Sequence, residues 1–552
     1  MAAMVTVLFL LATASCGIAF DVEKPTSQGF VGGNRIGILG RTVEEYRGIP
    51  YAQPPLGRLR FQPPQPHQNW EGVVDATSRR TACPQVVISP LLSAGVNFTE
   101  DCLHLNVWTP VARIQTPAPV LVSIHGGGFS HGSSSVEVFN GAILAARTGF
   151  IVVSFNYRLG VLGFLDANSP EAPGNVGLMD QNLALRWIQE NIHHFRGDPS
   201  RVTIFGESAG GMSAHAHVIS PMSSGLFKTA CLMSGTLHSR DFVEPVSESV
   251  HKGNAVAVAV GCADGNTSLA SHPESVVACL RTKSADELVL AASEKLAPKI
   301  FPFVPTFPNE FLPNDPAVAV KEGLFNPVDL IVGVTTDEGA IALLYPPRLQ
   351  LLAERIEGLE EESFNRSIHE SIFSWLKTNS SKNLAPYTSE VCDKASLRRA
   401  YVDFLSDNTF VCPKHFTAEG HSEHGHSVYS YVFAYMSAKS DLPTWMGTPH
   451  SWDLGYILGF PLVNQEQFDA KDAAMSQTFI NVLSTFADTG APAKRLHEET
   501  DEQEEKDQEK GSSDEPPPKA PPGRRPAFKP KPGVQAKRRT TTPTPPLKRR
   551  RF

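Results

Sequence analysis

The chain has 552 residues, of which 41% are hydrophobic and 19% are charged. These proportions are typical of a globular protein with a large core. The formal net charge of −8 at pH 7 argues against a nucleic-acid-binding protein, so no nucleic acid is expected as a partner. The length would accommodate several domains, but α/β enzymes often exceed the average domain size.

The N-terminus has the features of a secretory signal peptide. Residues 4–12 form a mostly apolar run that is too short to cross a bilayer. The small residues Gly17 and Ala19 permit cleavage after Ala19. We therefore interpret residues 1–19 as a signal peptide and expect a secreted, extracellular protein. No later stretch is apolar for long enough to be a transmembrane helix.

Secretion makes disulfides and glycosylation possible. Cys231 lies in an apolar run and is predicted to be a buried free thiol. The other cysteines beyond the signal peptide suggest pairing between sequence neighbours: Cys83 with Cys102, Cys262 with Cys279, and Cys392 with Cys412. This pairing is a hypothesis, because the sequence alone permits other connectivities. Asn-x-Ser/Thr triplets predict glycosylation at Asn97, Asn266, Asn365 and Asn379.

Strand and helix patterns alternate from about residue 118. Residues 181–192 have apolar positions at helical spacing, and the pattern ends near Gly197-Asp198-Pro199. Repeated strand–helix–strand units predict an α/β fold with a large, mostly parallel central sheet and helices on both faces. Short apolar or β-branched runs predict strands at residues 120–124, 151–155, 202–205, 230–233, 330–334 and 428–434.

The composition changes at about residue 491. Residues 498–510 are charge-dense and mostly acidic, proline clusters follow, and the end is basic. Residues 491–552 are therefore predicted to be a disordered tail that cannot bury a core. The basic end suggests contact with polyanions such as proteoglycans or nucleic acid. The alternatives are a solvated tail without a partner and the product of an alternative reading frame.

The motif Gly206-Glu207-Ser208-Ala209-Gly210 follows a predicted strand and precedes a predicted helix. This context is typical of a nucleophile elbow, a tight turn that presents a reactive serine and needs small flanking residues. The helix N-terminus offers backbone N–H groups to a developing oxyanion. The alternative is a glycine-rich turn with an inert serine.

The second glycine motif is Gly126-Gly127-Gly128, which follows His125 at the end of the first predicted strand. Glycines allow the backbone to approach a substrate carbonyl, so their N–H groups can contribute to an oxyanion hole. The alternative is a flexible turn. We interpret His125 as a residue that packs this loop rather than as a catalytic base.

A serine nucleophile needs a base, and the base needs an orienting acid, in the order serine, acid, histidine in this architecture. Asp337 and Glu338 follow the strand at residues 330–334, and the residues alone do not choose between them. The histidines that remain as candidates for the base are His415, His421, His424, His426 and His450. His450 follows the last predicted strand and is favoured. His421, His424 and His426 are predicted to lie in an exposed loop, with weak metal binding as the alternative.

Together these features resemble the type-B carboxylesterase/cholinesterase family over residues 22–490. The motifs that carry the resemblance occur in the family's order: Arg47-Gly48-Ile49-Pro50-Tyr51-Ala52, Pro54-Pro55-Leu56-Gly57, Glu100-Asp101-Cys102-Leu103-His104-Leu105-Asn106-Val107, Asn156-Tyr157-Arg158-Leu159-Gly160 and Gly174-Asn175-Val176-Gly177-Leu178-Met179-Asp180-Gln181. The resemblance implies an α/β-hydrolase domain over residues 20–490.

The resemblance also implies site residues. It assigns Glu338 as the acid and His450 as the base, ahead of Gly459-Phe460-Pro461-Leu462. The residues that match the family's oxyanion donors are Gly127, Gly128 and Ala209. The residues that match polar positions around the triad are Glu207, Ser234 and Asp453. The first two neighbour pairs of cysteines also match disulfides of the family.

Some features depart from the family pattern. No tryptophan lies between Cys83 and Cys102, so a cholinesterase-type cation–π site is doubtful, and a general carboxylesterase is favoured over an acetylcholinesterase. Phe301 and Phe303 are candidates for an acyl pocket or for the core. Family members usually continue past Thr489 into a further structured segment. The resemblance implies that, in members with a third disulfide, the partner of Cys412 would lie in that segment, where this chain has its charged tail. Cys412 is therefore expected either to pair with Cys392 or to stay free.

The sequence therefore predicts a secreted hydrolase of small-molecule carboxylic esters that works through an acyl-enzyme and needs no metal or other cofactor. The alternative is a catalytically silent adhesion or ligand-binding protein on the same fold. The presence of Ser208, Glu338 and His450 argues against that alternative. A third possibility is a polyanion-binding protein that acts through the basic tail.

Overall fold

The computed structural model describes residues 20–78, 81–87, 95–111, 117–297, 299, 301–343, 360, 362, 366, 386–389 and 391–492. The predicted signal peptide, the predicted tail from residue 493 onward, and the sequons at Asn365 and Asn379 lie outside these residues. The predictions made for them therefore stay predictions.

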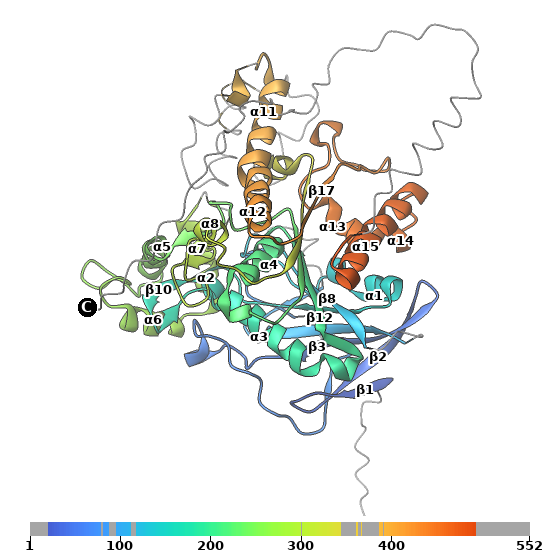
Figure 1. Ribbon diagram of the computed structural model, residues 1–552. Helices are drawn as coiled ribbons and strands as arrows, with labels where there is room; N and C mark the ends of the chain where they lie inside the picture. The colour runs from blue at the N-terminus through green and yellow to red at the C-terminus, as the bar shows by residue number, and fades with distance from the viewer. Residues whose placement is uncertain are drawn as a thin grey trace, which may run out of the picture. The chain divides into compact units, whose positions relative to one another are not determined.

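The described residues form an 11-stranded sheet with a parallel and an antiparallel part (Figure 1). Strand β4 (Val73–Asp75) pairs with β2 outside the main path. Along that path the strands are β1 (Val22–Pro25), β2 (Phe30–Ile38), β3 (Arg41–Pro50), β7 (His104–Pro110), β9 (Ile151–Phe155), β8 (Ala118–Ile124), β12 (Gly197–Glu207), β13 (Thr229–Met233), β16 (Asp329–Thr335) and β17 (Val428–Phe433).

The strands from β9 to β17 are all parallel to their neighbours, which confirms the predicted parallel sheet. The neighbours β1–β2, β2–β3 and β3–β7 along this path are antiparallel, and β7 also pairs with β9 in antiparallel orientation. Strands β2 and β3 form a hairpin with Leu39 and Gly40 at its tip, both at positive φ (50° and 70°). Two such residues make the turn that matches the natural twist of a hairpin.

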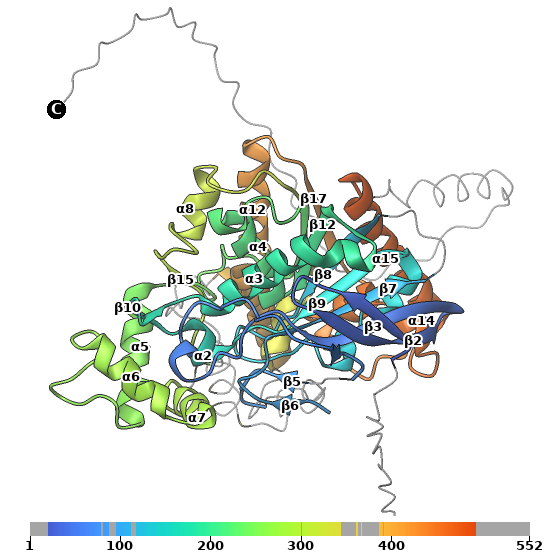
Figure 2. The same ribbon diagram turned by 90° about the horizontal axis from the view of Figure 1, so that it is seen from below.

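Helices cover both faces of the sheet (Figures 1 and 2). The described α-helices are α1 (Ala142–Thr148), α2 (Gly160–Phe164), α3 (Val176–Asn191), α4 (Ala209–Ile219), α5 (Val246–Ala259), α6 (Pro273–Thr282), α7 (Ala285–Lys295), α8 (Pro316–Lys321), α11 (Lys394–Ser406), α12 (Cys412–Glu423), α13 (Trp452–Ile457), α14 (Phe460–Val463) and α15 (Ala470–Thr489).

The two faces of the sheet carry separate hydrophobic cores because successive side chains of a strand point to opposite faces. In β8, Val120 and Val122 join the core that α3 and α4 cover, whereas Leu121 joins the core that α1 and α15 cover. Strands buried on both faces read as continuous apolar runs, which is why the sequence located them.

All six strand segments predicted from residue 118 onward are strands. The helix predicted at residues 181–192 overlaps α3, which begins five residues earlier and ends one residue earlier than expected. The helix was expected to end near Gly197-Asp198-Pro199, but it ends earlier. The helix ends at Asn191, a 3-10 turn follows, and Gly197 already begins β12.

The two disulfides implied by the family resemblance are present, Cys83–Cys102 and Cys262–Cys279. Cys231 is buried and free, as predicted. Pairing between sequence neighbours is wrong for Cys392 and Cys412, which are both free and exposed. The sequon residues Asn97 and Asn266 are exposed, so both are accessible to modification.

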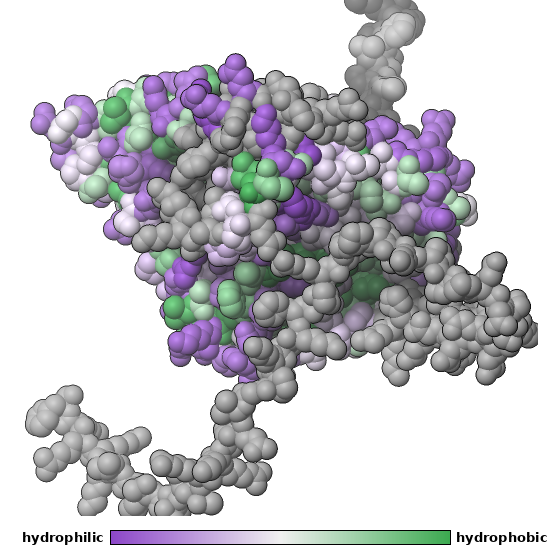
Figure 3. All heavy atoms as spheres, turned by 90° about the horizontal axis from the view of Figure 1, so that it is seen from above, coloured by the Kyte–Doolittle hydropathy of each residue, from purple (hydrophilic) through white to green (hydrophobic). Residues whose placement is uncertain are grey.

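On the face seen in Figure 3, hydrophobic and hydrophilic side chains are intermixed. Within the described ranges, no helix combines the length and the apolar character that crossing a membrane requires.

Candidate active site

Ser208 lies between the end of β12 at Glu207 and the start of α4 at Ala209. Its backbone has φ 59° and ψ −126°, a strained conformation for a residue other than glycine, and its N–H donates to Met233 O at 2.8 Å. A side chain at Gly210 would place Cβ 2.1 Å from Ile124 O, so the helix packs this closely only with glycine there. The local geometry is that of a nucleophile elbow.

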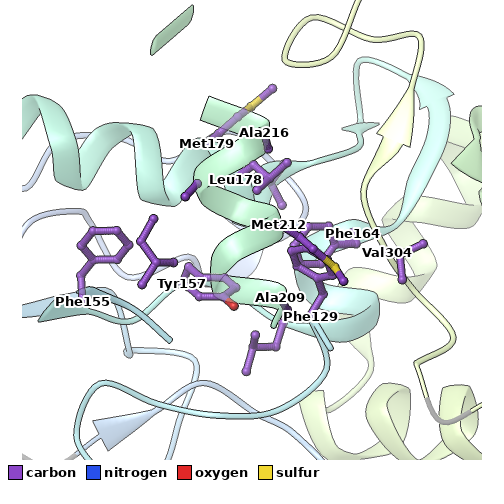
Figure 4. Close-up of a cluster of buried hydrophobic side chains, with 14 of the residues drawn as sticks. Phe129, Phe155, Tyr157, Phe164, Leu178, Met179, Ala209, Met212, Ala216 and Val304 are labelled. Carbon is purple, nitrogen blue, oxygen red and sulfur yellow. The ribbon is translucent and has the colours of Figure 1, made fainter. Parts of the chain in front are cut away.

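A hydrophobic cluster holds the N-terminal part of α4 in place (Figure 4). Ala209, Met212 and Ala216 on α4 belong to the same buried cluster as Phe129 and Phe164, whose rings meet edge to face at 5.1 Å. Because this packing fixes the helix, it also fixes the direction of the N–H groups at its first turn.

Glu338 and His450 meet across the ends of two adjacent strands. Glu338 follows β16, His450 follows β17, and a bridge between Asp337 and Pro449 joins their loops. The Oε2 of Glu338 lies 2.5 Å from Nδ1 of His450. The side chains are 0% and 6% exposed, respectively, so the contact is made away from water.

The second carboxylate oxygen of Glu338 is also fixed. Its Oε1 accepts hydrogen bonds from Ser234 Oγ at 2.6 Å and from the N–H of Thr335 at 2.7 Å. A carboxylate with both oxygens bound cannot rotate freely, so it holds the imidazole of His450 in one orientation.

The other ring nitrogen of His450 faces a second carboxylate. Its Nε2 lies 3.1 Å from Oε1 of Glu207, which also accepts a hydrogen bond from Ser451 Oγ at 2.7 Å. Among the described residues, no hydrogen bond joins Ser208 Oγ to His450. Both side chains line the same cavity, and a hydrogen bond between them can form when the substrate complex is assembled.

The buried carboxyl groups change the protonation of this site. Burial alone lowers the pKa of His450, but the neighbouring Glu207 and Glu338 outweigh it and raise the pKa to about 9. Burial raises the pKa of Glu207. Burial, with the charges of Glu207 and Glu338, raises the pKa of Asp453 to about 7. The neutral form of His450 therefore becomes more abundant as the pH rises.

The glycine loop lies directly against the elbow. A Cβ at Gly126 would come within 3.3 Å of Ser208 Cβ. Gly127 has φ 107°, and a Cβ there would lie 2.1 Å from His131 O, so the turn needs glycine at this position. In the part of the chain that the structure describes, no hydrogen bond occupies the N–H of Gly127 or Gly128.

The elbow, the glycine loop and His450 enclose a cavity of about 210 Å³. Phe301 lines this cavity, whereas Phe303 is buried in the core and does not. Its lining residues are Gly126, Gly127, Gly128, His131, Gly132, Phe139, Glu207, Ser208, Phe301, Ile341, His450, Ser451 and Leu454.

The other candidates lie outside the cavity. His125 is buried, stacks on Tyr157 with ring centroids 4.4 Å apart, and packs the loop as expected. Asp337, the alternative acid, pairs with Arg399 at 2.5 Å. Asp453 accepts a hydrogen bond from Tyr431 OH at 2.8 Å, and its Oδ1 is buried without a partner within the described residues.

The prediction of an exposed loop is wrong for His421. It lies at the end of α12, is buried, and packs its ring on Phe325 at a centroid distance of 3.8 Å. The sequence is polar there because only one face of this last turn is covered. Across the described ranges, no group of three or more His, Cys, Asp or Glu side chains is arranged to hold a metal ion.

His131 and the contact of Ser451 with Glu207 were not predicted from the sequence. The only available signal for His131 was a polar residue shortly after the glycine motif. Ser451 stood directly beside His450, but its partner is 244 positions away in the chain. Neither role follows from local spacing.

A parallel sheet with a strand–serine–helix elbow, followed by an acid and a histidine at the ends of later strands, defines the class of α/β-hydrolases. The chain belongs to the carboxylesterase family, whose model matches residues 21–515. It is similar to the acetylcholinesterase of Bungarus fasciatus, with 35% identity over 503 residues that cover 88% of this chain and 82% of that protein. Membership of this family supports an ester hydrolase.

Proposed function

We propose that this protein hydrolyses small-molecule carboxylic esters, with Ser208 as nucleophile, His450 as base and Glu338 as the acid that orients His450. The observation that carries the proposal is the 2.5 Å contact between Glu338 and His450, made beside a cavity that Ser208 also lines. A structural acid–histidine pair does not need a serine on a strained turn in the same cavity, whereas the triad of an α/β-hydrolase places its nucleophile on such a turn.

The reaction begins when neutral His450 accepts the proton of Ser208 Oγ at Nε2 while the oxygen attacks the ester carbonyl. Glu338 stabilises the imidazolium that forms. The N–H groups of Gly127, Gly128 and Ala209 stabilise the negative charge on the carbonyl oxygen. The alcohol leaves with the proton from His450, and water then attacks the acyl-enzyme by the same route in reverse.

Glu207 is proposed to tune this base. Its carboxyl group lies 3.1 Å from Nε2 of His450 and stabilises the protonated ring, which does not act as a base. In the reactive state, Nε2 is unprotonated and faces Ser208. Ser234 supports the triad through its hydrogen bond to Glu338. Asp453, with its pKa raised to about 7, is only partly ionised at neutral pH, and it does not touch the triad in the described residues.

The cavity suggests the class of ester. Beside the catalytic groups its wall is formed by Phe139, Phe301, Ile341 and Leu454, which favours uncharged acyl groups. This agrees with the expectation of a general carboxylesterase. We further propose that the protein is secreted and glycosylated at Asn97 and Asn266, which are exposed, in agreement with its two disulfides.

Glu207→Gln is expected to shift the acid limb of kcat/KM to lower pH. The wild-type rate rises with pH as His450, with its raised pKa, loses a proton. Removing the Glu207 charge lowers that pKa, so the neutral base forms at a lower pH. The measurement is a pH–rate profile for 4-nitrophenyl butyrate. Glu322→Gln, an exposed residue at the end of α8, is the control. An unshifted limb in Glu207→Gln would refute the tuning role.

The proposed chemistry is tested by rapid mixing of the purified chain with excess 4-nitrophenyl butyrate. An acyl-enzyme predicts a burst of nitrophenol, up to one equivalent per chain, when hydrolysis of the acyl group is the slower step. Quenching the reaction in acid and finding an added butyryl group on Ser208 by mass spectrometry would identify the nucleophile. Folded protein with neither turnover nor acylation would point instead to a silent binding protein.

A further inference from the structure

His131 lies on the wall of the proposed catalytic cavity, at the end of the glycine loop. The residue is 5% exposed, and its Nδ1 is buried without a hydrogen-bond partner in the described part of the chain. Buried polar nitrogens normally have a partner, so an unpaired one in a ring that lines a cavity needs an explanation. The mechanism above does not use this ring.

The backbone around His131 is fixed on both sides. Its N–H donates to Gly127 O at 3.0 Å. The next residue, Gly132, is held by two hydrogen bonds with the side-chain amide of Gln85, at 2.8 and 2.9 Å. The imidazole stacks on Phe301 with ring centroids 5.9 Å apart and planes inclined by 23°. The ring is therefore preorganised rather than free to seek another partner.

The chemistry of the ring limits what it can bind. Burial lowers the pKa of His131 to about 4, so the ring is neutral at neutral pH. A neutral imidazole has one N–H donor and one acceptor nitrogen. It is suited to an uncharged oxygen and gives no charge attraction to a carboxylate or a phosphate. Its stacking partner Phe301 is one of the two residues that the sequence suggested for an acyl pocket or for the core, and it lines the cavity, which favours a position of the ring on the acyl side.

We propose that His131 is a specificity-determining residue whose N–H donates a hydrogen bond to an uncharged oxygen in the acyl group of the substrate. The favoured substrates are then esters whose acyl chain carries an ether, hydroxyl or carbonyl oxygen close to the ester. Esters with a purely aliphatic acyl group fill the same space but leave the imidazole unpaired. The inference rests on the proposed hydrolase function and deepens it.

The test compares 4-nitrophenyl methoxyacetate with 4-nitrophenyl butyrate. Their acyl chains are of nearly equal length, and an ether oxygen replaces one methylene group. The measured quantity is the ratio of kcat/KM for the two esters, after subtraction of spontaneous hydrolysis. Intrinsic reactivity is the same for every variant and cancels when the ratios are compared. Loss of one hydrogen bond in His131→Phe is expected to lower the ratio by roughly three- to tenfold.

Two conservative variants keep the test decisive if the phenylalanine is poorly tolerated. An asparagine or glutamine amide places a donor near the position of Nδ1 or Nε2, respectively, so one of His131→Asn and His131→Gln should restore the ratio toward wild type. The control is Ile341→Leu, which changes the shape of the same cavity without a polar atom and should leave the ratio within twofold.

The outcomes separate the two proposals. If the wild type hydrolyses both esters and the ratio in His131→Phe, His131→Asn and His131→Gln equals that of the wild type, the role of His131 is refuted and the hydrolase function stands. If Ile341→Leu lowers the ratio as much as His131→Phe, cavity shape explains the effect and the hydrogen bond is refuted. If folded wild-type protein hydrolyses neither ester, both proposals are overturned.

Discussion

Ser208→Ala is expected to reduce kcat for ester hydrolysis by about a millionfold, because no acyl-enzyme can form without the hydroxyl. The variant should still hydrolyse the ester roughly a thousandfold faster than the uncatalysed reaction in water, because the oxyanion donors and substrate binding remain. The elbow should survive, since alanine is no larger than serine and the N–H of residue 208 still donates to Met233 O. Substrate binding should therefore be nearly unchanged.

The measurement is steady-state hydrolysis of 4-nitrophenyl butyrate, with thermal unfolding to show that the variant is folded. Ser224→Ala is a matched control, because Ser224 is exposed in the turn after α4 and lies outside the cavity lining. A folded Ser208→Ala variant that retains more than a tenth of the wild-type kcat would rule out this serine as nucleophile.

Glu338→Gln is expected to reduce kcat by about ten-thousandfold. The amide is nearly the same size, and its oxygen can still accept from Ser234 and Thr335. Its nitrogen would then face Nδ1 of His450, where the carboxylate Oε2 lies at 2.5 Å. An amide N–H facing Nδ1 favours the tautomer with the proton on Nε2, and that tautomer cannot accept the proton of Ser208.

The matched control is Asp337→Asn, a change of the same kind at the adjacent residue. Asp337 accepts a hydrogen bond from the N–H of Thr448 at 2.8 Å and pairs with Arg399, so it supports the loop rather than the imidazole. We expect Asp337→Asn to retain kcat within about tenfold, since a partly exposed pair contributes little. Equal losses in both variants would mean that Glu338 acts only by holding the fold.

Glu338 and Asp337 have different roles that their positions in the sequence do not distinguish. Both acids follow the same strand, and spacing did not choose between them. The family resemblance assigned Glu338, and the structure brings its carboxylate to His450 while Asp337 turns to Arg399. Side-chain direction at the end of a strand depends on the loops that pack against it, and those loops come from distant parts of the chain.

The buried parallel strands and the glycine motifs were predictable because their signals are local. The antiparallel strands β1, β2, β3 and β7 were not predicted. The pairing of β1, β2 and β3 is local, but polar residues and glycines interrupt the apolar pattern of β2 and β3. Strand β7 pairs with β3 from a distant part of the chain. His421 was misplaced because the surface that covers it, including Phe325, is about one hundred residues away in the chain. The same reason hid His131, whose role depends on the cavity rather than on its neighbours.

The most direct test of the central claim is covalent labelling with a fluorophosphonate probe, followed by peptide mass spectrometry. Such a probe reacts with a serine only when a base and an oxyanion hole are assembled around it. We predict stoichiometric modification of Ser208 in the folded wild type, none in Ser208→Ala, and strongly slowed labelling in Glu338→Gln. No modification of a folded, monodisperse wild type, or modification of a different serine, would contradict the proposed active site.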